Sequence, residues 1–107
     1  MYIKNQTFND EETLMEMLFD FSLGEAAPLI IELKEEIEKE LESNTAFKEY
    51  RATLTDEEDR LELETEERLI RLSEALLARF DRFQTKEQKL YGIKNGEETV
   101  LYEIDLI

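Results

Sequence analysis

One acidic stretch, TDEEDRLELETEE from Thr55 to Glu67, decides how the middle of the chain folds. It contains eight carboxylates, one arginine and two leucines. Thr55 and Glu58 have the spacing of a helical capping box, and the acidic residues that follow would lie in the first turns, where the helix dipole favours negative charge. On this interpretation a long helix begins here and continues to Phe83.

The same stretch also fits a β-hairpin in which DEED forms the turn. Alternation places one set of residues on a common face, namely Tyr50, Ala52, Leu54, Leu61, Leu63 and Thr65. In a helix, Leu61 and Leu63 would lie far apart around the axis, and Glu62 and Glu66 would interrupt the apolar face. We therefore favour the hairpin and keep the long helix as the alternative.

Two further helices are predicted in the first half of the chain. In NDEETLMEMLFDFSLG, Asn9 stands three residues before Glu12, as in a capping box, and apolar residues recur at helical spacing until Gly24. Pro28 fits the first turn of the next helix, because its missing N–H needs no partner there. The apolar stripe of that helix is Ile30, Leu33, Ile37 and Leu41.

The C-terminal half combines a third helix with a β-hairpin. The segment from Glu66 to Phe83 has one apolar side, formed by Leu69, Leu72, Leu76, Phe80 and Phe83. After it, Asn95-Gly96 separates two alternating runs, which is the strongest short-range signal of a hairpin. The predicted fold is α+β, with about three helices packed on an antiparallel sheet that contains a C-terminal β-hairpin. With the long central helix, the alternative is a mostly α protein with one terminal hairpin.

The charge of the chain is large and unevenly distributed. We expect residues 1–107 to form a single acidic α+β domain, because a chain of this length has room for one modest core. The net charge is −15, and no Lys or Arg occurs between Lys4 and Lys34. The segment from Arg68 to Lys94, with seven basic residues against three acidic ones, carries +4. Such segregation destabilises a compact chain unless the charges are spread over solvent or matched by a partner, so its functional meaning lies in association.

The composition argues against catalysis. The chain has no histidine and no cysteine, so the commonest general base, thiol nucleophiles and the Glu-x-x-His di-iron motif are missing. Its three glycines are isolated, which excludes a phosphate-binding loop. The run DEEDRLELETEE has Leu61 where an EF-hand loop needs glycine. We therefore expect no enzymatic activity, no cofactor and no dedicated metal site.

Membrane and nucleic-acid binding are also disfavoured. The longest apolar run, PLII, is far shorter than a membrane span, and MYIKNQTF lacks the features of a signal peptide, so we expect a cytoplasmic protein without membrane contact. The run ARFDRFQTKEQK interleaves basic and aromatic residues, but Phe80 and Phe83 share the predicted apolar helix face, so we assign them to the core. Because the net charge would repel phosphate, we expect no direct binding to nucleic acid.

The carboxylates point to a cationic partner. Glu32, Glu36 and Glu40 are like-charge neighbours on the second helix, a local cost that such a partner would offset. In small size, acidity and lack of catalytic groups, the chain resembles the DNA-mimic, anti-restriction and anti-CRISPR inhibitors of phages and mobile elements. This resemblance of general character implies a non-enzymatic inhibitor or regulator that occupies the basic groove of a nucleic-acid-handling host protein. The residues predicted to bind the partner are Glu32, Glu35, Glu36, Glu40, Asp56, Glu57, Glu58, Asp59 and Glu62.

An alternative function requires no mimicry. The protein would then be an acidic structural or adaptor domain, and it would self-associate if a surface allowed it. The apolar stripes of the second and third predicted helices have heptad-like spacing. Each covers fewer than two heptads, which is too short for a coiled coil. The last predicted strand, Thr99 to Ile107, is long and apolar, and an uncovered edge there would pair across a two-fold axis. We expect a monomer or a homodimer.

Overall fold

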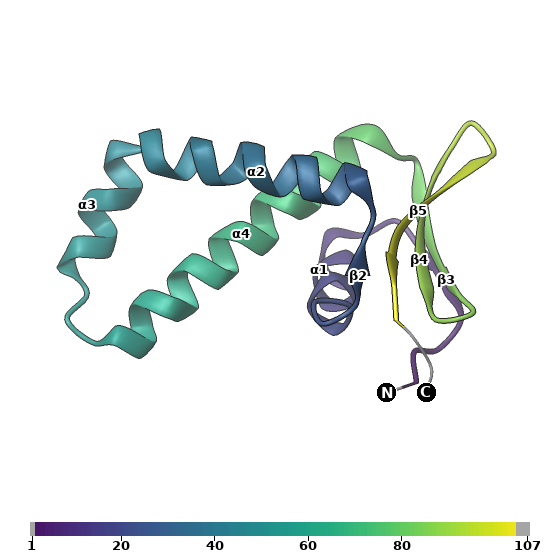
Figure 1. Ribbon diagram of the computed structural model, residues 1–107, viewed down its shortest axis with the longest axis horizontal. Coiled ribbons are helices and arrows are strands. Elements are labelled where there is room, and N and C mark those ends of the chain that lie inside the picture. Colours follow the sequence, from purple (N-terminus) through teal and green to yellow (C-terminus); the bar gives the residue numbers. More distant parts are fainter. Residues whose placement is uncertain (1, 105–107) are drawn as a thin grey trace.

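The computed structural model describes residues 2–104 and has an α+β fold (Figure 1). Its elements are β1 (Gln6–Phe8), α1 (Glu11–Asp20), β2 (Glu25–Ala26), α2 (Pro28–Ser43), α3 (Thr45–Thr53), α4 (Glu57–Arg79), β3 (Arg82–Lys86), β4 (Lys89–Lys94) and β5 (Glu97–Glu103). The predicted class is confirmed, with four helices in the described residues instead of about three. The strands form one antiparallel sheet in the order β1-β3-β4-β5-β2, and the predicted C-terminal hairpin is confirmed as β4 and β5.

The central acidic stretch forms the start of α4, so the prediction of a β-hairpin is wrong. Asp56 is the N-cap, and its carboxylate accepts a hydrogen bond from the N–H of Glu58 at 2.9 Å. Three carboxylates then occupy the first turn, where the helix dipole stabilises them. The alternating residues that favoured the hairpin do not mark a buried strand face, since Leu61 is 57% exposed. With no buried face to favour a strand, the capped helix forms, and the residues predicted as the first hairpin strand belong to α3 and its C-cap.

Two helix boundaries also differ from the predictions. Asp10, not Asn9, caps α1: its carboxylate accepts from the N–H of Thr13 at 2.9 Å and from the Thr13 hydroxyl at 2.6 Å. The last helix ends at Arg79, so the prediction that it reaches Phe83 is wrong. Phe83 lies in β3 and stacks on Phe8 with ring centroids 5.8 Å apart. A buried aromatic ring can pack into the core from a helix or from a strand. The helical spacing of Phe83 therefore did not reveal that the helix ends before it.

The predicted second helix is correct at both its start and its buried side. It begins at Pro28, and all four residues of its apolar stripe are buried. Together with α1 and the C-terminal part of α4, this helix supplies the side chains that pack on one face of the sheet. The largest fully buried side chains include Tyr102, Phe21 and Phe83, so the core is centred where α1 meets the sheet.

Tight turns join the last three strands. Asn95 and Gly96 have φ angles of 51° and 81°, the left-handed conformation that the predicted two-residue turn requires. A second turn, at Glu87 and Gln88, has φ angles of 53° and 61° and was not predicted. The strands β1 and β2 were also not predicted, because they are too short to show periodicity. In the described part, β2 covers the C-terminal end of β5, so the predicted free edge is wrong there, and residues 105–107 lie outside the described residues.

The helices form an arm that leaves the sheet on one side. Figure 1 shows α2 and α4 running away from the sheet, with α3 joining them at the far end. The described molecule is accordingly elongated, with extents of 43 × 31 × 23 Å. The arm carries most of the predicted partner-binding residues.

Candidate functional site

The predicted partner-binding carboxylates fall into two separate groups. Glu32, Glu35 and Glu36 are exposed on the first half of α2, close to the sheet, whereas Asp56 to Asp59 lie at the start of α4, beside α3 (Figure 1). Asp56 also serves as the N-cap of α4. The structure therefore does not bring the two groups into one continuous patch.

Cations of the arm pair inward with carboxylates of neighbouring helices. Arg68 donates to Glu38 at 2.5 and 3.2 Å, which ties α4 to α2. Arg71 bonds Glu67 at 2.9 Å and Glu40 at 3.0 Å, so Glu40, a predicted binding residue, already has a cationic partner. Glu64 takes part in two further pairs: Arg51 joins α3 to α4 through it, and Arg68 lies 3.8 Å from it within α4.

These pairs change the balance of charge that the arm presents to solvent. The hydrogen bond to Glu38 raises the pKa of Arg68 above its usual value, and those to Glu67 and Glu40 do the same for Arg71. The guanidinium groups of Arg68 and Arg71 thus stay cationic, and they are held between the helices. Among residues 2–104, the predicted carboxylates other than Glu40 take part in no ion pair, so they remain available to a partner.

A shallow groove between α1 and α4, which we call the α1/α4 groove, has an apolar floor and an acidic rim. The floor is formed by Met15, Phe19, Leu61, Thr65 and Leu69, and the rim by Glu16, Asp20, Glu62 and Glu66. Phe19 is 61% exposed and Leu61 is 57% exposed, which is unusual for large apolar side chains. Every charged residue that lines the groove is a carboxylate.

Only one residue of the α1/α4 groove, Glu62, was predicted as a site residue. The sequence carries a signal for the others: on α1, Met15 and Phe19 are four residues apart, and Glu16 and Asp20 follow each by one position. Such a pattern gives an apolar stripe beside an acidic stripe. It was overlooked because α1 has a second apolar side, which faces the core.

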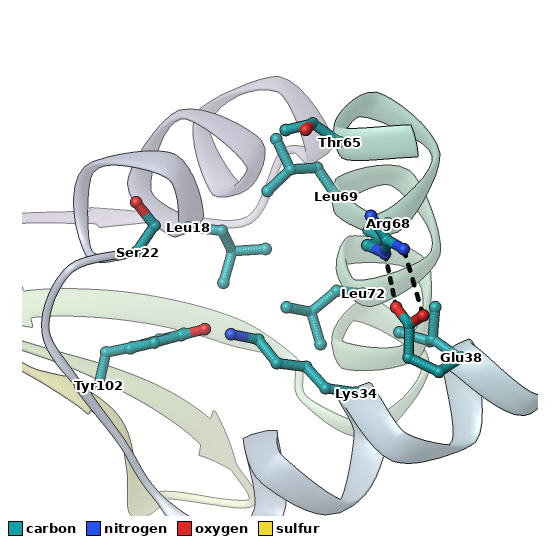
Figure 2. Close-up of a pocket in the computed structure, with 10 residues that line it drawn as sticks. Leu18, Ser22, Lys34, Glu38, Thr65, Arg68, Leu69, Leu72 and Tyr102 are labelled. Atoms are coloured by element: carbon teal, nitrogen blue, oxygen red, sulfur yellow. Dashed lines mark hydrogen bonds and ion pairs between the residues drawn. The ribbon is translucent and has the colours of Figure 1, made fainter. Parts of the chain in front are cut away.

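A cavity of about 230 Å³ lies beside this groove, between α1, α2, α4 and β5 (Figure 2). Four aliphatic side chains line it, Leu18, Ile37, Leu69 and Leu72. Its polar groups come from Ser22, Lys34, Glu38, Thr65, Arg68 and Tyr102. None of these residues was predicted as a site residue, because the cavity joins four elements that are distant along the chain.

The basic stretch near the C-terminus is partly engaged within the protein. Phe83 is fully buried and Phe80 packs against it with centroids 6.0 Å apart, which confirms that both rings belong to the core. Lys86 bonds Glu98 at 3.0 Å, and Lys94 lies 3.4 Å from Asp81. These aromatic rings are thus not exposed for base stacking.

Comparisons with family models, curated proteins and solved structures find no match to this chain. Within residues 2–104, no helix is sufficiently long and apolar to cross a bilayer. The same residues contain no group of three or more carboxylates arranged to hold a metal ion.

Proposed function

We propose that this protein is a non-enzymatic acidic regulator or inhibitor, acting in the cytoplasm, that binds a basic amphipathic helix of a partner protein in the α1/α4 groove. One observation carries the proposal: large exposed apolar side chains form the floor of the groove, and all of its charged residues are acidic. Amphipathic helices dock by laying an apolar face into such a groove. A rim of carboxylates selects a helix whose flanks are Lys and Arg.

The other exposed carboxylates support the same kind of partner. The groups on α2 and at the start of α4 lie outside the groove, so they would act at longer range, by raising the rate of encounter with a cationic protein. Nucleic-acid-handling proteins carry cationic surfaces for phosphate, and such a host protein is the partner class that we propose.

The test uses a synthetic Leu/Lys peptide with an amphipathic helical pattern, and a scrambled peptide of the same composition. We expect the patterned peptide to bind more tightly by fluorescence anisotropy, and the variant Phe19→Gln/Leu61→Gln to weaken it by about tenfold or more, because each lost apolar contact is worth about 1.5–3 kcal/mol. Ile31→Gln, which changes an equally exposed residue on α2, is the matched control. Equal binding of both peptides, or an unchanged affinity in the double variant, would show that only bulk charge attracts the peptide.

A second candidate, mimicry of nucleic acid, is favoured by the unpaired carboxylates of α2 and of the α4 start. If these charges imitate phosphates, neutralising Glu32, Glu35 and Glu36 as Gln should abolish capture of DNA-binding proteins by the immobilised protein, and duplex DNA should elute them. Neutralising Asp56 to Asp59 as Asn and Gln tests the second group. The groove variant should leave this capture intact, which separates the two candidates.

A further inference from the structure

The hydroxyl of Tyr102 lines the cavity of about 230 Å³. Tyr102 as a residue is 2% exposed, and its hydroxyl forms no hydrogen bond with any residue between 2 and 104. Figure 2 shows this hydroxyl and the Lys34 ammonium pointing toward one another at the edge of the cavity. In the described residues every side-chain N or O atom that is shielded from solvent has a hydrogen-bond partner, so the Tyr102 hydroxyl is reached by solvent at the cavity and can bond a group that enters it.

Lys34 is the second feature. The chain has 28 carboxylates, yet Lys34 forms no ion pair within residues 2–104, and its ammonium lies 5.3 Å from the centre of the Tyr102 ring. The carboxylate four residues later, Glu38, is held by Arg68. Lys34 is thus an exposed cation without a carboxylate partner, at the edge of an apolar cavity.

The polar groups of the cavity are mostly donors. Lys34, the Tyr102 hydroxyl and the Ser22 hydroxyl can all donate, whereas the one carboxylate in the lining, Glu38, is already occupied. Opposite them, Leu18 and Leu72 form an apolar wall (Figure 2). A donor-rich end and an apolar wall are complementary to a molecule with an anionic head and a hydrocarbon body.

We propose that this cavity binds a small amphipathic monocarboxylate. Its carboxylate bonds the Lys34 ammonium and the Tyr102 hydroxyl, and its hydrocarbon part lies among the leucines. The volume is below the roughly 300–1,000 Å³ of pockets for drug-sized ligands, so the ligand is a short or medium chain. The inference is independent of the proposed function: the cavity and the α1/α4 groove share only Thr65 and Leu69, which the test leaves unchanged.

The test compares octanoate with octanol and octylamine, which share its chain length and differ in charge. Methyl NMR of the full chain should show saturable shifts at Leu18 and Leu72 on adding octanoate, and a dissociation constant about tenfold or more below that of octanol or octylamine, because charge-assisted hydrogen bonds are the strong ones.

Variants then assign the binding to the two polar groups. Lys34→Met, which keeps the apolar stem, should weaken octanoate by about tenfold and leave octanol unchanged, and Tyr102→Phe should weaken octanoate by several-fold. Lys39→Met, an exposed lysine on the same helix, should leave both unchanged. Absence of saturable shifts, equal affinity for octanoate and octanol, or an equal loss in Lys39→Met would overturn the proposal.

Discussion

Gln88 joins the two ends of the described chain to a single turn. Its carboxamide accepts from the N–H of Ile3 and donates to the C=O of the same residue, both at 3.1 Å. Its own carbonyl accepts from the N–H of Ile104 at 2.9 Å. Gln88 is buried and has a φ of 61°, a value that residues other than glycine rarely adopt. These three backbone groups thus depend on one residue in an unfavourable conformation.

At the residue scale we predict that Gln88→Ala lowers the free energy of unfolding by about 2–3 kcal/mol, because both backbone groups of buried Ile3 lose their partner. The neighbouring exposed residue Glu87, with a φ of 53°, is the control: Glu87→Gly should be neutral or stabilise by up to about 1 kcal/mol, since glycine accepts that conformation. Urea denaturation measures both. A cost below about 0.5 kcal/mol for Gln88→Ala would contradict this role.

At the scale of elements, the end of the arm is the least buried part of the fold. No residue of α3 is buried, and the buried residues of α4 all lie in its second half, at Leu72, Ser73 and Leu76. The tip is held by the partly buried Phe47, the ion pair of Arg51 with Glu64, and a hydrogen bond from Arg60 to the carbonyl of Leu54 at 2.6 Å. Such contacts stabilise weakly, because surface ion pairs are worth about 0–1 kcal/mol.

We therefore predict that the tip opens locally before the molecule unfolds. In hydrogen exchange, the amides of α3 and of residues 57–66 should exchange faster than those of β3, β4 and β5 by about two orders of magnitude or more. Arg51→Ala should speed exchange only in these two segments and leave the thermal midpoint within about 1 °C. Uniform protection of α3 and the sheet would mean that the arm unfolds only together with the core.

At the scale of the molecule, the sheet edges discourage self-association. The edge strands β1 and β2 have only three and two residues, too few for extended pairing. The part of β5 that β2 does not pair with begins with Glu97 and Glu98, and two copies would bring these charges together. A net charge of −15 adds a general repulsion between copies.

We accordingly predict a monomer, in contrast to the homodimer that the sequence also allowed. Light scattering should give the mass of a single chain at every protein concentration, at both low and high salt. High salt removes the general repulsion, so it is the stricter condition. A mass that doubles with concentration, and returns to one chain in Val100→Lys, would instead identify pairing through the uncovered part of β5.

The sequence by itself determined the features that depend on a few neighbouring residues. Pro28 fixed the start of α2, the Asn95-Gly96 pair fixed the last hairpin, and the four-residue apolar stripe fixed the buried side of α2. The α+β class followed from these elements. Each of these signals acts within one or two turns of chain, so it operates in the same way whatever the remainder of the molecule does.

Only the tertiary structure decided the rest. Whether TDEEDRLELETEE was helix or strand depended on a buried face, and the arm provides none for Leu61. The candidate sites likewise depend on which elements become neighbours: the α1/α4 groove sets Phe19 beside Leu61, and the cavity sets Lys34 beside Tyr102. Burial and charge pairing are properties of residues far apart in the chain, so local patterns carry no record of them.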